Sequence, residues 1–200
     1  MFNIALMKII LASQSPRRLF LLQAAGFSID VRPSHIDECP QPGEDVQTMT
    51  SRLCLAKAKA CLLQDDELQV PVIAADTLVA LGDEVLGQPE DIQQAKEMIQ
   101  KLSGQKHQVH TTVCVRLADD YLLQTVTTEV SFRMISDAEI DVYVRYNEIL
   151  DKAGAYAIQG GASGFITGIQ GSLDNVIGLP VQETIRLLHK IRCEQVASEA

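Results

Sequence analysis

The stretch ILASQSPRRLFLLQAAGF (residues 10–27) decides the fold class, because it changes from a strand pattern to a helix pattern within a few residues. The apolar run over residues 7–12 predicts a buried strand, and residues 16–25 predict a helix that ends at Gly26. Ser15 is a favoured N-cap residue and Pro16 suits the first helical position. A strand that leads directly into a helix is typical of α/β folds.

The polar residues of this stretch allow two interpretations. The unpaired N–H groups and the positive dipole end of a helix start can bind an anion. Ser13 can add a hydroxyl donor, and Arg17 and Arg18 can bind phosphate oxygens. The alternative is an ordinary capped helix with two solvated arginines, and the stretch alone leaves both interpretations open.

Length and charge exclude several classes of protein. The 200 residues suffice for a sizeable core, and no linker or internal repeat divides them, so we predict a single domain over residues 1–200. The formal net charge of −9 argues against nucleic acid or an anionic membrane as a partner. A small anionic substrate remains compatible, because a few arginines and a metal ion can reverse the sign of the charge locally.

The cysteines and the N-terminus point to a cytoplasmic protein. Five cysteines lie far apart without a C-x-x-C pair, which favours a reducing compartment over a zinc site or a disulfide framework. The apolar N-terminus lacks a basic start and a cleavage site, and it is too short to span a bilayer. We interpret it as a buried strand.

Strand and helix patterns alternate along the rest of the chain. Further strands are predicted over residues 70–81, 84–87, 111–117 and 125–134, and further helices over 46–63, 91–102, 136–146 and after Pro180. The helix over 46–63 is expected to bury Leu53, Ala56, Ala60 and Leu63, and the strand over 125–134 to bury Val126, Val130, Phe132 and Met134. Ser136 and Glu139 form a capping-box signature. The pattern predicts an α/β fold with a mixed sheet.

Two acidic positions are candidates for chemistry. Asp76 emerges from a strand of small residues, where a carboxylate can bind Mg²⁺ or act as a general base on water. The alternative is an aspartate that caps a turn or pairs with a lysine. Asp37 and Glu38 follow a strand-like run, and paired carboxylates there can hold a divalent ion or remain solvated.

Lys57 and Gln159 are candidates for contact with a substrate. Lys57 is in line with Cys54 and Cys61 on its helix, so the stem of its side chain is expected to lie along partly buried surface. Its ammonium then either reaches the solvent or points at a phosphate. Gln159 can donate and accept hydrogen bonds, which suits a nucleobase edge. On local grounds, the alternative is an ordinary glycine-rich loop with no role in binding. His107 and His110 lack a third ligand and are interpreted as structural.

Taken together, these segments resemble the Maf family of nucleoside triphosphate pyrophosphatases. Eight segments match in the order and spacing of the family: LASQSPRR, IDE, RLCLAKAKA, AADT, LGQPED, LSGQKHQVHT, DKAGAYAIQG and GSLDNVIGLP. One such motif is weak, whereas eight collinear motifs over nearly the whole chain are specific.

The resemblance implies hydrolysis between the α- and β-phosphates of a nucleoside triphosphate, which yields the monophosphate and pyrophosphate. It implies that Asp76 is the proton acceptor that activates water. It also implies that Ser13, Ser15, Arg18, Glu38 and Lys57 handle the phosphates and a divalent cation (Mg²⁺ or Mn²⁺), with Glu38 and Asp76 as the metal-binding carboxylates. The fold it implies is a mixed, strongly twisted sheet with helices around a central cleft, similar to inosine triphosphatases, in a homodimer.

Three positions indicate which substrates the resemblance implies. Arg17, Thr77 and Gln159 stand where the subgroup acting on methylated guanosine triphosphate carries Trp, Gln and Glu. They place this sequence with the enzymes that hydrolyse dTTP and UTP, modified pyrimidine triphosphates included, and so limit the incorporation of non-standard nucleotides. An amide matches the donor and acceptor pattern of a pyrimidine edge. One position departs from the family: Gln88 replaces its usual lysine, so the role of that lysine is not transferred to it.

Two other functions compete with this hypothesis. Family members are also associated with division control, which would make the chain a partner-binding protein, although nothing in the sequence encodes that role. A general purine house-cleaning enzyme is the other alternative, and it would prefer deoxyinosine triphosphate to dTTP.

Overall fold

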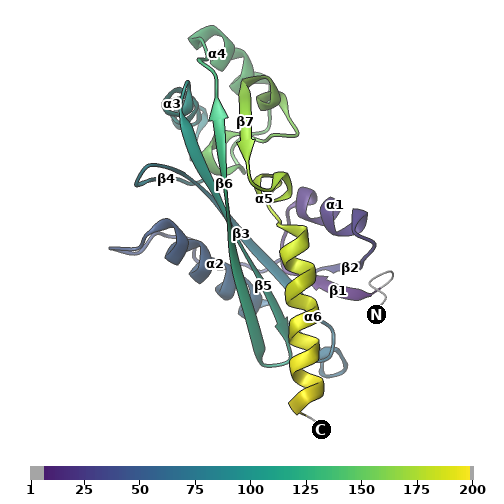
Figure 1. Ribbon diagram of the computed structural model, residues 1–200. Helices are drawn as coiled ribbons and strands as arrows, with labels where there is room; N and C mark the ends of the chain where they lie inside the picture. Colours follow the sequence, from purple (N-terminus) through teal and green to yellow (C-terminus); the bar gives the residue numbers. More distant parts are fainter. Residues whose placement is uncertain (1–6, 199–200) are drawn as a thin grey trace. The chain divides into compact units, whose positions relative to one another are not determined.

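Three parallel strands form the first part of the sheet (Figure 1). In the computed structural model, which describes residues 7–198, β1 (Lys8–Leu11) pairs in parallel with β2 (Ser28–Val31) and with β3 (Val72–Leu81). The first six residues of the apolar N-terminal run lie outside the described residues. β1 confirms the predicted strand, and its last three residues are buried.

The chain divides into two compact units. Unit 1 comprises Met1–Asp76, Thr111–Val126 and Gly178–Ala200, and unit 2 comprises Thr77–His110 and Thr127–Ile177. β3, β5 (Lys106–Leu117) and β6 (Asp120–Phe132) each contribute one part to unit 1 and the other part to unit 2.

Unit 1 places helices beside the parallel strands. α1 (Pro16–Ala24) packs against β2. The other helical elements of the unit are α2 (Val46–Ala60), the short 3-10 turn Asp65–Glu67 and α6 (Val181–Ser198), which confirms the helix predicted after Pro180. One buried cluster of this unit combines Ile10 and Val72 from the strands with Cys54 from α2 and Cys114 from β5.

Unit 2 contains the antiparallel additions to the sheet. β4 (Glu84–Leu86) pairs with the end of β3, and β7 (Ile166–Gln170) pairs with β6. Its helical elements are α3 (Ile92–Leu102), α4 (Asp137–Tyr146), α5 (Leu173–Ile177) and the 3-10 turns Ala153–Ala155 and Gly161–Phe165. α3 packs against α4, as Figure 1 shows, and Ser136 with Glu139 forms the predicted capping box.

The strand order is β2-β1-β3-β5-β6-β7, with β4 attached to β3. Because parallel and antiparallel pairs occur in one sheet with helices around it, the predicted α/β class with a mixed sheet is confirmed. Among the residues that the structure describes, no helix is both long and apolar enough to cross a membrane.

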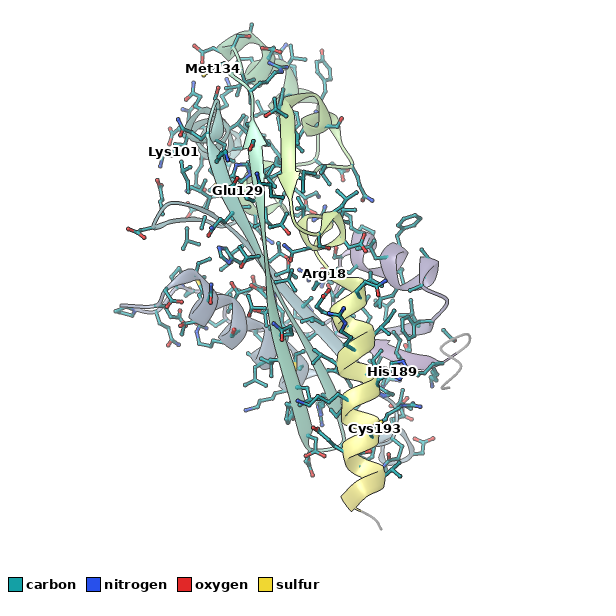
Figure 2. All side chains as sticks on the ribbon, viewed as in Figure 1. Arg18, Lys101, Glu129, Met134, His189 and Cys193 are labelled. Carbon is teal, nitrogen blue, oxygen red and sulfur yellow. The ribbon has the colours of Figure 1, made fainter. Side chains whose placement is uncertain are left out.

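Two predictions of buried faces were wrong in part, since Leu53 is buried on the first face and Val130 and Phe132 on the second, as predicted. α2 ends at Ala60, which is exposed, and the helix buries Met49, Thr50, Leu53, Cys54 and Ala58. Its buried face is therefore rotated from the predicted one by about one position. Met134 lies beyond the end of β6 and its side chain is 75% exposed, although the alternation along the strand assigned it to the core (Figure 2).

Candidate active site

The carboxyl ends of the three parallel strands bring most of the predicted residues into one region of unit 1. Ser13 follows β1, the loop that carries Glu38 follows β2, and Asp76 stands on β3 beyond its pairing with β1. Loops at the carboxyl ends of parallel strands are the usual place for ligand sites in α/β folds. The position of Asp76 therefore follows from the register of β1 with β3.

The start of α1 is a tight polar turn. Ser15 is the N-cap, and its Oγ accepts a hydrogen bond from the Arg18 amide over 3.5 Å. The Oγ of Ser13, a buried side chain, accepts from the Ser15 amide over 3.2 Å and from Arg18 Nη1 over 3.1 Å. The predicted cap is confirmed, and both serines hold the turn together.

Arg18 is not a solvated arginine. Its Nε donates to the carbonyl oxygen of Gly178 over 2.8 Å, which joins α1 to the chain just before α6 (Figure 2). Burial lowers the pKa of the Arg18 guanidinium, and the nearby carboxylate of Asp76 opposes this shift. Because a guanidinium keeps its proton in proteins, Arg18 supplies a fixed positive charge beside Asp76. Arg17, its neighbour, is half-buried.

Lys57 joins the two acidic candidates. Its Nζ lies 2.6 Å from Asp76 Oδ1 and 2.9 Å from Glu38 Oε1. The lysine side chain is mostly buried, whereas the Glu38 side chain is half exposed. The interpretation that the lysine merely reaches the surface is therefore wrong, because its ammonium contacts two carboxylates. The interpretation that Asp76 pairs with a lysine is confirmed.

Asp76 has one oxygen without a protein partner. Its side chain is 5% exposed, and Oδ2 is buried with no hydrogen-bond partner among the described residues. A buried carboxylate oxygen that lacks a donor is costly, and such groups are typical of sites completed by water, a cation or a substrate. Asp76 is therefore placed to accept a proton or to bind a cation.

The carboxylates suit a hard divalent cation that takes one or two ligands from the protein and the others from water and substrate. Within residues 7–198, no group of three or more His, Cys, Asp or Glu side chains forms a ready-made metal cage. Mg²⁺ is commonly bound by one or two carboxylates, with water and substrate phosphates completing its shell. Asp76 and Glu38, held around one ammonium, match that pattern of donors.

The predicted selectors of the base are not all in unit 1. Thr77 follows Asp76 on β3 and is the first residue of unit 2. Gln159 is exposed in a turn of unit 2, which the Gly160 amide closes by donating to the Ala157 carbonyl over 3.0 Å. Gln88 is an exposed residue of unit 2 after β4. The roles in base selection assigned to Arg17, Thr77 and Gln159 remain predictions.

Two features of this region were missed by the sequence reasoning. Gly178, which binds Arg18 through its carbonyl, lies in the GSLDNVIGLP motif, so the motif was the available signal. Cys54 lies on α2 near Asp76, where its Sγ contacts the Ala74 carbonyl at 3.5 Å and burial raises the pKa of the thiol well above its ordinary value. That cysteine is therefore an inert packing residue.

Comparison with known proteins gives consistent matches over most of the chain. The family described as "Maf-like protein" matches residues 8–191. A dTTP/UTP pyrophosphatase of Anaeromyxobacter dehalogenans (strain 2CP-C) is 47% identical over 190 residues, which cover 92% of this chain and 93% of that protein.

Two further relatives are similar at comparable coverage. A nucleoside triphosphate pyrophosphatase of Haemophilus ducreyi is 42% identical and covers 96% of this chain and 98% of its own length. A dTTP/UTP pyrophosphatase of Chromobacterium violaceum is 43% identical, with 90% of this chain and 93% of that protein aligned. Among solved structures, the Ham1 protein of Staphylococcus aureus aligns with a TM-score of 0.43 and 14% identity, covering 62% of this chain and 71% of that chain.

Proposed function

Because the chain belongs to the Maf family, we propose that it hydrolyses nucleoside triphosphates to the monophosphate and pyrophosphate, with dTTP and UTP as its preferred substrates. The observation that carries the proposal is the buried carboxylate of Asp76, which has one oxygen on Lys57 and the other without a donor among the described residues. Arg18, a second cation, lies near the same carboxylate.

The proposed division of labour follows from this geometry. Arg18, Ser13 and Ser15 at the start of α1 bind the phosphates, because cations and helix N-termini bind phosphate oxygens well. Lys57 engages Oδ1 of Asp76, so Oδ2 is the oxygen left to take a proton from the attacking water. The oxygen of water bonds to the α-phosphorus while its proton passes to Asp76. The bond from that phosphorus to the oxygen bridging the α- and β-phosphates breaks, and pyrophosphate leaves with the bridging oxygen.

We propose that Asp76 and Glu38 hold a Mg²⁺ or Mn²⁺ ion together with the substrate phosphates. When bound, such an ion neutralises phosphate charge and favours departure of pyrophosphate. With the ion bound, the Lys57 ammonium, which contacts both carboxylates, would be placed to donate to a phosphate oxygen of the substrate as well.

The preference for dTTP and UTP rests on the names of the relatives and on Arg17, Thr77 and Gln159. We further propose that the enzyme is a cytoplasmic homodimer: its five cysteines are all free thiols, which suits a reducing compartment, and the family resemblance implies the dimer.

The test is pyrophosphate release from a panel of dTTP, UTP, dCTP, dGTP and deoxyinosine triphosphate. We expect dTTP and UTP to react fastest, and Asp76→Asn to lower kcat by a factor of about 10²–10⁴, the usual contribution of a positioned general base. Asp83→Asn, at the exposed turn between β3 and β4, is the matched control and should keep full activity.

Two outcomes would overturn the proposal. Wild-type turnover in Asp76→Asn would show that another group activates water. Faster hydrolysis of deoxyinosine triphosphate than of dTTP would show a purine house-cleaning enzyme instead.

A further inference from the structure

The segment that presents Glu38 is a long loop without regular secondary structure. It runs over residues 33–45, between β2 and α2, and we refer to it as the Glu38 loop. Loops of this length inside a compact unit are uncommon, and they are usually functional when they are ordered. A side chain on such a loop keeps its position only if something outside the loop fixes the backbone.

Arg52 on α2 provides such an anchor. Its Nε and Nη2 bind the two carboxylate oxygens of Glu44, the Nη2 contact measuring 2.8 Å, and Nη2 also donates to the Cys39 carbonyl over 3.1 Å. A forked contact of this kind fixes both distance and orientation. Arg52 therefore ties both the end of the loop and the residue next to Glu38 to the helix.

The partners of Arg52 are themselves ordered within the loop. The Glu44 side chain is 8% exposed and also accepts a hydrogen bond from the Gln41 amide over 3.0 Å. Asp37 Oδ1 accepts from the Cys39 amide over 2.9 Å, which fixes the turn on the other side of Glu38. Together with Arg52, these contacts hold the backbone before and after Glu38.

Arg52 and Lys57 both lie on α2, and Arg52 is the nearer of the two to the start of the helix. Lys57 Nζ lies 2.9 Å from the Glu38 carboxylate, while Arg52 Nη2 donates to the carbonyl of the next residue, Cys39. One rigid helix thus carries both the cation that Glu38 contacts and the anchor that keeps Glu38 there.

We infer that Arg52 is a positioning residue that holds the Glu38 loop so that Glu38 can take part in cation and phosphate binding. The inference rests on the proposed function for its catalytic consequence, although the order of the loop can be measured without it. It predicts that loss of Arg52 weakens cation binding more than it slows the chemical step, because Asp76 is held by other contacts.

The test compares Arg52→Met, Arg52→Lys and Glu44→Gln with a control in unit 2. Arg133→Met is the matched control, because Arg133 also binds one carboxylate, that of Glu139, and two carbonyls, those of Gly164 and Met134. Both Arg-to-Met variants remove a guanidinium that binds a carboxylate and backbone carbonyls, but only Arg52→Met removes it beside the Glu38 loop.

Hydrogen exchange is the readout that does not depend on activity. We expect amides of residues 33–45 to exchange about tenfold faster in Arg52→Met and to be unchanged in Arg133→Met. Binding of Mn²⁺ is measured by electron paramagnetic resonance with a dTTP analogue that carries a methylene bridge between the α- and β-phosphates. Half-saturation should need about tenfold more Mn²⁺ in Arg52→Met, the usual effect of losing a residue that orients a ligand.

Kinetics give the second readout. At saturating Mn²⁺, kcat of Arg52→Met should remain within about threefold of the wild type. The Mn²⁺ concentration that gives half-maximal activity should rise in Arg52→Met, and in Arg52→Lys it should lie between the values of Arg52→Met and the wild type. Glu44→Gln should shift the Mn²⁺ requirement in the same direction, because it removes the ionised partner.

Unchanged loop exchange or unchanged Mn²⁺ binding in Arg52→Met would overturn the inference, as would an equal effect of Arg133→Met. If the wild type hydrolyses no triphosphate, the proposed function fails, and loop exchange together with Mn²⁺ binding still decides the role of Arg52.

Discussion

At the scale of single residues, His107 is a buried titratable group with an aromatic environment. Its Nε2 lies 2.7 Å from the Tyr156 hydroxyl, and its ring meets the rings of Phe132 and Tyr156 edge-to-face. The side chain is 2% exposed, and burial lowers the pKa of His107 from 6.5 to about 4. All three residues belong to unit 2.

The stability of the protein should therefore fall as the pH drops from 6.5 to 4. In this range the unfolded chain takes up a proton on His107 that the folded chain does not, so the free energy of unfolding decreases with decreasing pH. The lowered pKa corresponds to about 3 kcal/mol over the full window. Urea unfolding at several pH values between 4 and 7.5 measures the slope.

Two variants isolate the contribution of the imidazole. His107→Phe should lose this part of the pH dependence. Tyr156→Phe keeps the imidazole, so it should retain the slope while losing about 1 kcal/mol from the missing hydrogen bond. An identical slope in His107→Phe and the wild type would assign the pH dependence to other groups.

Single residues also show where sequence reasoning stops. The cap at Ser15 was predictable, because a cap depends on residues within one helical turn. The direction of the Lys57 ammonium was not, because its partners come from β3 and from the Glu38 loop. Arg18 meets Gly178, which is 160 residues away, and no local pattern encodes that contact.

At the scale of elements, the turn Ala153–Ala155 depends on one glycine. Gly154 has a φ of +66°, and its amide donates to the Gly87 carbonyl over 2.9 Å. A Cβ at this position would lie 3.0 Å from Cγ2 of Val79 on β3. The close approach of the turn to the strand thus requires a residue without a side chain.

Gly154→Ala should lower the free energy of unfolding by about 2–4 kcal/mol, from left-handed backbone strain together with overpacking against Val79. Gly164→Ala is the matched control in the same unit, because its Cβ would meet no atom within 4 Å and its φ is not left-handed. Urea midpoints should separate the two variants. Equal midpoints would mean that the turn adjusts to a methyl group.

The elements also show which patterns the sequence carries clearly. The helix after Ser136 was predictable from its capping box, and β4 from the turn at Gly82-Asp83. β5 begins at Lys106, five residues before the predicted strand, because polar residues alternate with buried ones there and His107 fills an inward position. The sequence pattern does not distinguish a buried histidine from an exposed one, so the predicted strand begins later than β5 does.

At the scale of the whole molecule, the cysteines are distributed unevenly between the units. All five belong to unit 1, and Cys54, Cys61 and Cys114 are buried there. Unit 2 contains no cysteine, so the reactivity of the thiols reports on unit 1 alone.

Destabilising unit 2 should expose these thiols in unit 1. β3, β5 and β6 run through both units, so we expect the chain to unfold in one cooperative transition. In a background with Cys39→Ser and Cys193→Ser, Gly154→Ala should speed labelling of the buried thiols roughly 30-fold for each 2 kcal/mol lost. Suppose instead that the buried thiols of the Gly154→Ala variant are labelled at the same rate as without that substitution, under conditions where circular dichroism shows partial unfolding. The two units would then unfold separately.

The ammonium shared by Asp76 and Glu38 also constrains how this site can be lost in evolution. If Glu38 is replaced first, the pair between Lys57 and Asp76 survives, and if Asp76 is replaced first, Lys57 keeps Glu38. If Lys57 is replaced first, the buried carboxylate of Asp76 loses the cation that contacts its Oδ1 and keeps only the charge of Arg18 nearby. The cost then approaches about 3–5 kcal/mol of stability, which is the loss when one partner of a buried pair is removed. Descendants that no longer need the activity would therefore lose an acid before the lysine, and Lys57 alone in such a sequence would be a remnant of the former site rather than a sign of turnover.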